Sequence, residues 1–211
     1  MSEALQRLDA SAHPDDIVAA VERDGAVIVE SLLAPEVVDR VNEEVGATLD
    51  AVDPDEELFN DVMKAFHGPF TKQLAGAPGL SRTFAVDVMC NPLLLAICDR
   101  VLLPSCARYQ LNLGHLLQRG PGSDEQLLHR DELVWSDMPR PGPELQLATV
   151  IAFVDFTREN GATSSPRGSA WPATLITNVA ANSPQPQAAA AMRRRLMPVT
   201  RRARRMNAQA V

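Results

Sequence analysis

The residues best suited to chemistry are His129 and Asp131, which stand one residue apart in the tripeptide His129-Arg130-Asp131. Proteins hold non-haem Fe(II) with two imidazoles and one carboxylate on one face of the ion, which leaves the other positions open. On a β-strand, residues i and i+2 point to the same side, so both side chains could bind one ion while Arg130 faces away. Such a tripeptide also arises by chance, so the motif alone leaves open a surface His/Asp pair.

The segments that must position this motif begin with helices and continue with strands. Proline at a first helical turn, a capping side chain and apolar residues at helical spacing predict the helices. We expect one helix capped by Asp15 or Asp16, a second that starts at Pro35, a third near residues 61–66 and a fourth over 92–103. A short strand is expected at 26–29. The rest of residues 50–80 is expected to be loop, because it is rich in acidic residues, Gly and Pro.

The second half of the chain favours strands separated by Gly/Pro turns. Alternating or β-branched runs predict strands at 108–113, at 126–129, at 145–156 as a central strand, and at 171–179. Turns are expected at 120–123 and 158–161. Helices followed by short strands favour a mainly β fold, in which N-terminal helices support a double-stranded β-helix (jelly-roll, cupin-like) core that is incomplete at its C-terminal end.

An ordered set of motifs resembles the phytanoyl-CoA dioxygenase-like family of Fe(II)/2-oxoglutarate oxygenases, which includes ectoine hydroxylases. The motifs are the opening at 24–36, Tyr109-Gln110-Leu111-Asn112-Leu113, the Gly120-Pro121-Gly122 turn, His129-Arg130-Asp131, Trp135, the apolar run 147–156 and Glu159-Asn160-Gly161-Ala162-Thr163. They span roughly residues 15–163. The resemblance therefore assigns a family domain to residues 1–163.

The resemblance implies an enzyme that hydroxylates an unactivated C–H bond of a small organic substrate, with Fe(II) as metal and 2-oxoglutarate as cosubstrate. His129 and Asp131 would be the iron ligands. Gln110 would line the substrate or 2-oxoglutarate pocket with Asn112 nearby, and an exposed strand face is the alternative for both. Trp135 would either pack against the substrate or be an aromatic residue of the core.

The chain departs from the family where the third ligand is expected. The family completes its triad with a later histidine, followed by an arginine whose bidentate fork binds the 2-oxoglutarate carboxylate. Residues 130–211 contain no histidine, and the remaining ones are His13, His67 and His115. His115 is a candidate for a cosubstrate contact or for a replacement ligand. Without the later histidine and the arginine, we expect the chain as written to be poorly stable and inactive. The alternative function is a non-catalytic jelly-roll remnant or binding protein.

The last quarter of the chain differs in composition from the rest. After Glu159 there is no Asp, Glu or Lys, whereas eight arginines follow, in a background of Ala, Pro and Gln. We therefore treat residues 164–211 as a divergent tail, either disordered or the product of a frameshift. The arginine clusters at 193–195 and 201–205 also suit nucleic acid or an acidic partner, but with no lysine, aromatic residue or known binding motif in that stretch we do not expect nucleic-acid binding.

A frameshift in a GC-rich gene is our hypothesis for this tail, because out-of-frame GC-rich codons produce Ala, Pro and Arg. We expect one of the other two reading frames after codon 163 to encode a later histidine and arginine, and the nucleotide sequence checks this. The hypothesis fails if neither frame does.

Composition sets the remaining limits. With 211 residues, 45% hydrophobic and 22% charged, the chain suits one globular domain. The start lacks the apolar stretch of a secretory signal, and no run is long enough to span a membrane. Cys90, Cys98 and Cys106 form no CxxC pair, which favours free thiols in a reducing cytoplasm. We expect a cytoplasmic protein that binds no membrane; the oligomeric state is left open.

Overall fold

The computed structural model describes residues 5–54, 61–124, 126, 131, 135, 137–139, 142–157, 160 and 174–177. Of residues 62, 63 and 174–177 it describes the backbone. The predicted strand at 126–129 therefore lies, except for Gln126, outside the described residues.

The larger sheet has the strand order β1-β2-β6-β5, and each neighbouring pair is parallel. The strands are β1 (Arg7–Asp9), β2 (Ala26–Glu30), β6 (Thr174–Thr177) and β5 (Ala148–Ile151). β2 is buried on both faces: Val27 and Val29 belong to the main core, and Ala26 and Ile28 to a second cluster with Leu5 and Phe156. Burial on both faces explains why β2 is a continuous apolar run without alternation.

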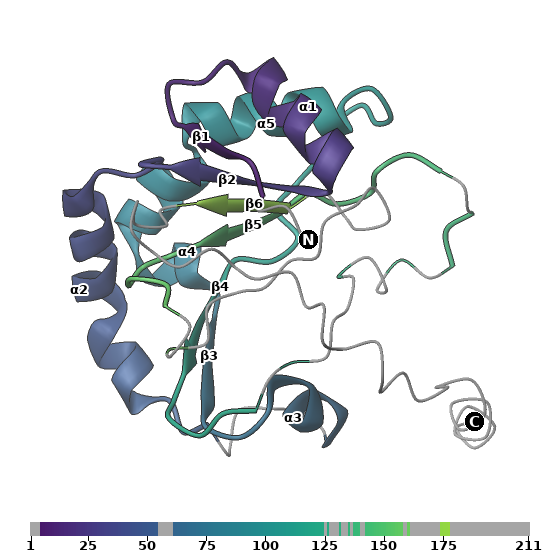
Figure 1. The fold of residues 1–211 in the computed structure, drawn as a ribbon. Helices are drawn as coiled ribbons and strands as arrows, with labels where there is room; N and C mark the ends of the chain where they lie inside the picture. The colour runs from purple at the N-terminus through teal and green to yellow at the C-terminus, as the bar shows by residue number, and fades with distance from the viewer. Residues whose placement is uncertain are drawn as a thin grey trace.

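Helices α1 (Pro14–Asp24) and α5 (Pro92–Leu102) lie side by side next to β1 and β2 (Figure 1). The cap of α1 is His13, whose Nδ1 accepts from the backbone N–H of Asp15 at 3.3 Å. The prediction that Asp15 or Asp16 caps this helix was therefore wrong. Asp15 instead forms an ion pair with Arg100 of α5, which joins the exposed ends of the two helices.

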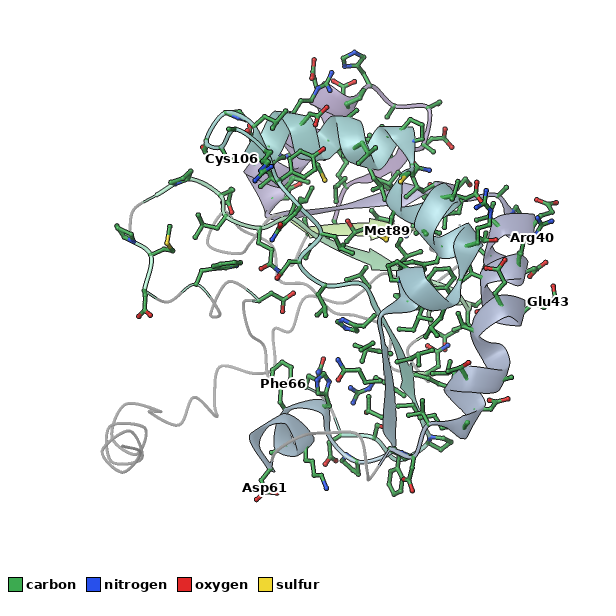
Figure 2. The ribbon with its side chains drawn as sticks, turned by 180° about the vertical axis from the view of Figure 1, so that it is seen from behind. Arg40, Glu43, Asp61, Phe66, Met89 and Cys106 are labelled. Atoms are coloured by element: carbon green, nitrogen blue, oxygen red, sulfur yellow. The ribbon has the colours of Figure 1, made fainter. Side chains whose placement is uncertain are left out.

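A smaller antiparallel sheet joins β3 (Thr71–Ala75) to β4 (His115–Arg119). Helix α2 (Pro35–Ala51) runs beside this pair, and α3 (Asp61–His67) lies at its far end (Figure 1). Leu74 pairs in register with Leu116, and both belong to the main core together with α2 residues. The outer side of α2 carries Arg40 and Glu43, which point away from the β3–β4 pair (Figure 2).

The connection between β3 and β4 contains α4 (Ala77–Leu80), the π-helix η1 (Phe84–Met89) and α5. Glu44 of α2 holds the start of η1. Its carboxylate accepts from the Ser81 hydroxyl, from the Thr83 hydroxyl at 2.8 Å and from the Thr83 backbone N–H at 3.1 Å. These hydrogen bonds, above all that from Ser81, hold the pKa of Glu44 below its usual value. The Glu44 carboxylate thus fastens this connection to α2.

Several elements predicted from local signals are confirmed: the strand at 26–29, the helices at 35, 61–66 and 92–103, and a strand within 171–179. Pro121 and Gly122 form the predicted turn. Asn160 is also in a turn, with its side chain accepting from Thr157 N at 2.9 Å, but its neighbours 158, 159 and 161 lie outside the described residues.

The prediction of a strand at 108–113 was wrong, because this segment has no regular structure and the strand is β4, at 115–119. Leu111 and Leu113 are exposed, so their alternation does not mark a buried face. The strand β3 was missed, since its sequence TKQLA carries little local β signal. The expected central strand at 145–156 is present as the shorter β5. Among the described strands β5 lies at one edge of the larger sheet, and β6 lies between β2 and β5.

The predicted fold class holds in part. Helices near the N-terminus and strands later in the chain are both present, but the described strands do not form the antiparallel sheets of a jelly roll. Their larger sheet is parallel throughout, because β6 pairs with both β2 and β5 in the same direction. No helix within the described ranges is long and apolar enough to cross a membrane.

A substitution at Gly120, directly after β4, tests how closely the backbone there approaches the backbone before β3. Its N–H donates to the Phe70 carbonyl at 2.7 Å, and a Cβ on Gly120 would lie 2.9 Å from that oxygen. We expect Gly120→Ala to lower the free energy of unfolding by roughly 1–3 kcal/mol, because backbone atoms must move. Urea unfolding measures the change.

The matched control is Gly46→Ala inside α2, where nothing lies within 4 Å of the added Cβ. We expect this variant to raise the free energy of unfolding by up to about 1 kcal/mol, since alanine stabilises a helix more than glycine does. A Gly120→Ala chain as stable as the parent would contradict the close approach of Gly120 to Phe70.

Candidate functional site

The strand β4 carries the best-defined candidate side chain, His115. Successive side chains of a strand point to opposite faces, so the burial of Leu116 in the core beside Leu74 turns His115 to the other face. His115 pairs with Ala75 in the β3–β4 register and is half-buried. The position of this imidazole therefore follows from the packing of its apolar neighbour.

The polar environment of His115 combines burial with a nearby carboxylate. Its Nδ1 atom is buried and, among the described residues, has no hydrogen-bond partner. Burial lowers the pKa of His115, and the negative charge of Asp131 opposes that shift in part. Asp131 is therefore close enough to act electrostatically on His115, although sixteen residues separate them along the chain.

The structure describes one of the two predicted iron ligands. Asp131 is exposed and is one of the described residues, whereas its partner His129 lies outside them. The assignment of His129 and Asp131 as ligands from one strand stays a prediction. The sequence offered His115 as a cosubstrate contact or a replacement ligand, and in the structure the negative charge of Asp131 acts on the pKa of this histidine.

The donor types at this place fit Fe(II). A carboxylate and an imidazole are both ligands that non-haem iron takes. The described part of the chain contains no group of three or more His, Cys, Asp or Glu side chains suited to a metal. Of the two iron ligands expected from the sequence, Asp131 lies within the described residues and His129 does not.

Gln110 and Asn112, predicted to line a pocket, are both exposed in the irregular segment that precedes β4. Tyr109 anchors this segment, because its hydroxyl donates to Asp99 Oδ1 of α5 at 2.7 Å. This hydrogen bond to a carboxylate, with a smaller effect of burial, raises the pKa of Tyr109 to about 12. Whether Gln110 and Asn112 contact a ligand stays a prediction.

Trp135 is more exposed than a core aromatic residue, with 38% of its surface accessible. Its Nε1–H donates to Oε1 of Gln146 at 3.0 Å. This contact ties the indole to the segment that leads into β5. A role for Trp135 against the substrate therefore stays a prediction, while its burial in the core is not observed.

His67, which the sequence did not single out, is buried at the other end of the β3–β4 pair. Its ring meets Phe66 edge to face, with centroids 5.1 Å apart, and its carbonyl accepts from the Thr71 hydroxyl at 2.9 Å. Phe66 lies on the side of α3 that faces the body of the fold, whereas Asp61 lies on its outer side (Figure 2). No sequence signal marked His67, because its burial depends on tertiary packing.

A shallow cavity of about 370 Å³ lies near the same end of the pair, lined by Pro54, Phe70, Lys72, Gln118, Arg119, Gly120 and Pro121. Its two cations already have partners. The Lys72 ammonium donates to the carbonyls of Leu49 (3.2 Å) and Asp50 (2.9 Å), at the C-terminal end of α2. Arg119 donates to the carbonyls of His67 and Asp124. These cations support the backbone at this end of the fold.

Comparison with known proteins shows the family of the chain through one match. A family model described as phytanoyl-CoA dioxygenase (PhyH) matches residues 21–205. The chain therefore belongs to the phytanoyl-CoA dioxygenase (PhyH) family. The match continues beyond residue 163, where the recognisable motifs end, while the division into a domain at 1–163 and a tail at 164–211 stays a prediction.

Three curated relatives, all named dioxygenases, illustrate the similarity. Dioxygenase trt7 of Aspergillus terreus is 33% identical over 77% of this chain and 57% of its own length. Multifunctional dioxygenase prhA of Penicillium brasilianum is 33% identical over 80% and 56%. Dioxygenase ALT11 of Alternaria alternata is 32% identical over 85% and 62%. The chain thus spans little more than half the length of these relatives.

The anchoring of Tyr109 can be tested alone, because it is the one tyrosine of the chain. A carboxylate acceptor stabilises the protonated phenol, so we expect Asp99→Asn to lower the pKa of Tyr109 from about 12 toward its ordinary value near 10. Ultraviolet absorbance of the phenolate follows the titration, and circular dichroism verifies that the chain stays folded. Asp87→Asn, an exposed change in η1, is the control and should leave the titration unchanged.

Proposed function

We propose that the protein is an Fe(II)- and 2-oxoglutarate-dependent oxygenase that hydroxylates a small organic molecule. The observation that carries this proposal is the His129-Arg130-Asp131 motif inside a PhyH-family match, with Asp131 acting on the half-buried His115. The relatives named dioxygenases support the reaction class.

In this proposal each residue has a limited task. His129 and Asp131 would hold Fe(II), which together with 2-oxoglutarate supplies the activation of O₂ that hydroxylation of an unactivated C–H bond requires. Gln110 and Asn112 would contact the substrate or cosubstrate from the segment anchored by Tyr109, and Trp135 would contact the substrate. Binding the metal by side chains on one side leaves the opposite positions open for these smaller molecules.

We also propose the finer features that accompany this function. The complete fold would be the jelly roll expected from the family resemblance, with the strands described here as part of it. The protein would work in the cytoplasm, where its three free cysteines suit reducing conditions. The non-catalytic alternative gains no support from the described residues and becomes an outcome of the experiment.

The test is conversion of 2-oxoglutarate to succinate by the 211-residue chain with Fe(II), O₂ and ascorbate. Loss of a residue that only orients a metal ligand lowers activity by roughly 10- to 100-fold. Loss of a ligand itself should cost no less, so we expect Asp131→Ala to lower this conversion by at least about 100-fold. Asp137→Ala, an equally exposed change nearby in sequence, is the control and should keep the parent rate.

Two results contradict the proposal. Equal conversion by the parent and by Asp131→Ala means that Asp131 does not hold the metal. Absence of both conversion and Fe(II) binding in the parent, measured by anaerobic titration, favours a non-catalytic member of the family.

A further inference from the structure

We propose that the cavity at the end of the β3–β4 pair, where β3 begins and β4 ends, binds a small organic anion with a flat apolar body, such as an aromatic carboxylate. Its volume of about 370 Å³ lies within the range of small-molecule sites. Two of its lining side chains, Lys72 and Arg119, are cations, and none of the described residues that line it is acidic. A lining of one sign of charge attracts a ligand of the opposite sign.

The positive charge of both cations is available to a ligand, because the partners that the structure records for them are neutral carbonyl oxygens. The Lys72 ammonium donates to two carbonyls at the C-terminal end of α2, at 2.9 and 3.2 Å, and Arg119 donates to the carbonyls of His67 and Asp124. An ammonium has three hydrogens to donate and a guanidinium has five. The carbonyls therefore hold the two cations in place and leave further donors for an anion.

Phe70 supplies an apolar wall for the same cavity. Its side chain is 53% exposed, and its φ of +59° is unusual for a bulky residue. The N–H of Gly120 donates to the Phe70 carbonyl at 2.7 Å, and a Cβ added at Gly122 would lie 3.5 Å from the Phe70 ring. Strained backbone persists where the surroundings enforce it, and such residues cluster at ligand sites. An exposed ring held in this way suits the flat face of a ligand.

The cavity is separate from the site that the proposed function uses. Lys72 pairs in register with Gln118, and both share a face of the strand pair with Leu74 and Leu116. His115, which the sequence offered as a cosubstrate contact, lies on the opposite face of β4. The inference therefore does not rest on the proposed function, and its test requires neither metal nor turnover.

The experiment titrates the ¹⁵N-labelled 211-residue chain with benzoate and follows the backbone amide resonances by nuclear magnetic resonance. We expect saturable shifts at residues 70–72 and 118–122. Benzamide has the same ring without the charge, and inorganic phosphate has charge without the ring. Each should bind at least about fivefold more weakly than benzoate, because each lacks one of the two interactions.

Variants of the lining test the two cations and the ring. Lys72→Met and Arg119→Gln should each weaken benzoate binding roughly tenfold, since each removes a charge-assisted hydrogen bond. Phe70→Ala should weaken the binding of benzoate and leave that of phosphate unchanged. Lys64→Met, at an exposed lysine of α3 outside the lining, removes the same charge as Lys72→Met and is the matched control, which should keep the parent affinity.

A further variant keeps the test informative if a cation variant does not fold. The side chain of Gln118 is exposed and lines the cavity, so Gln118→Glu adds a carboxylate there at nearly the same size. We expect this variant to lose benzoate binding, because like charges repel. Unchanged benzoate binding by Gln118→Glu contradicts the inference.

The other contradicting results address the class of ligand and its place. Benzamide binding as tightly as benzoate means that the cations play no part. Equal weakening by Lys72→Met and Lys64→Met means that only the overall charge of the protein matters. Phosphate binding more tightly than benzoate means that the ring of Phe70 is not used. Shifts confined to amides outside residues 70–72 and 118–122 place the anion elsewhere, and they also overturn the inference.

Discussion

The pairing of β3 with β4 is the constraint on which the candidate site depends. It brings Thr71–Ala75 against His115–Arg119 across a connection of about forty residues, whose closure costs conformational entropy. Burial of Leu74 and Leu116 in the core beside α2 offsets that cost. The same burial sets which face of β4 each side chain occupies, and so it places His115 on the face opposite Leu116.

The connection between the two strands is held in place by polar contacts as well as by apolar burial. Glu44 accepts hydrogen bonds from Ser81 and Thr83 where α2 meets the start of η1. Asn91 caps α5 with its side chain, and Tyr109 then returns to α5 through Asp99. Each contact removes freedom from the segments that flank β4. These contacts restrain the connection that leads from β3 to β4, and so they support the register in which His115 enters the pair.

Family membership and architecture carry different information about this chain. The PhyH match and the dioxygenase relatives indicate the reaction class, while the described strands form a parallel sheet and a separate antiparallel pair. The chain spans 56–62% of the length of the three relatives compared here. Function on a shared fold depends on the residues of the site, so a metal site in this chain has to be argued from its own side chains.

Sequence alone determined the elements that local signals specify. Proline at the first turn and apolar residues at helical spacing located α2 and α5, and a β-branched run located β2. The ordered motifs around His129 and Asp131 were also sufficient to indicate the family. These features could be predicted because each depends on residues close together in the chain.

Tertiary structure decided what depends on distant partners. The strand β3 was missed and β4 was placed too early, because the exposed Leu111 and Leu113 alternate as a strand does but pair with no strand that the structure describes. The half-buried position of His115 on the face of β4 opposite Leu116 was likewise beyond the sequence, since it depends on the register of β3 with β4. Strand register and the burial of a polar side chain are set by long-range packing, and local residue patterns do not encode them.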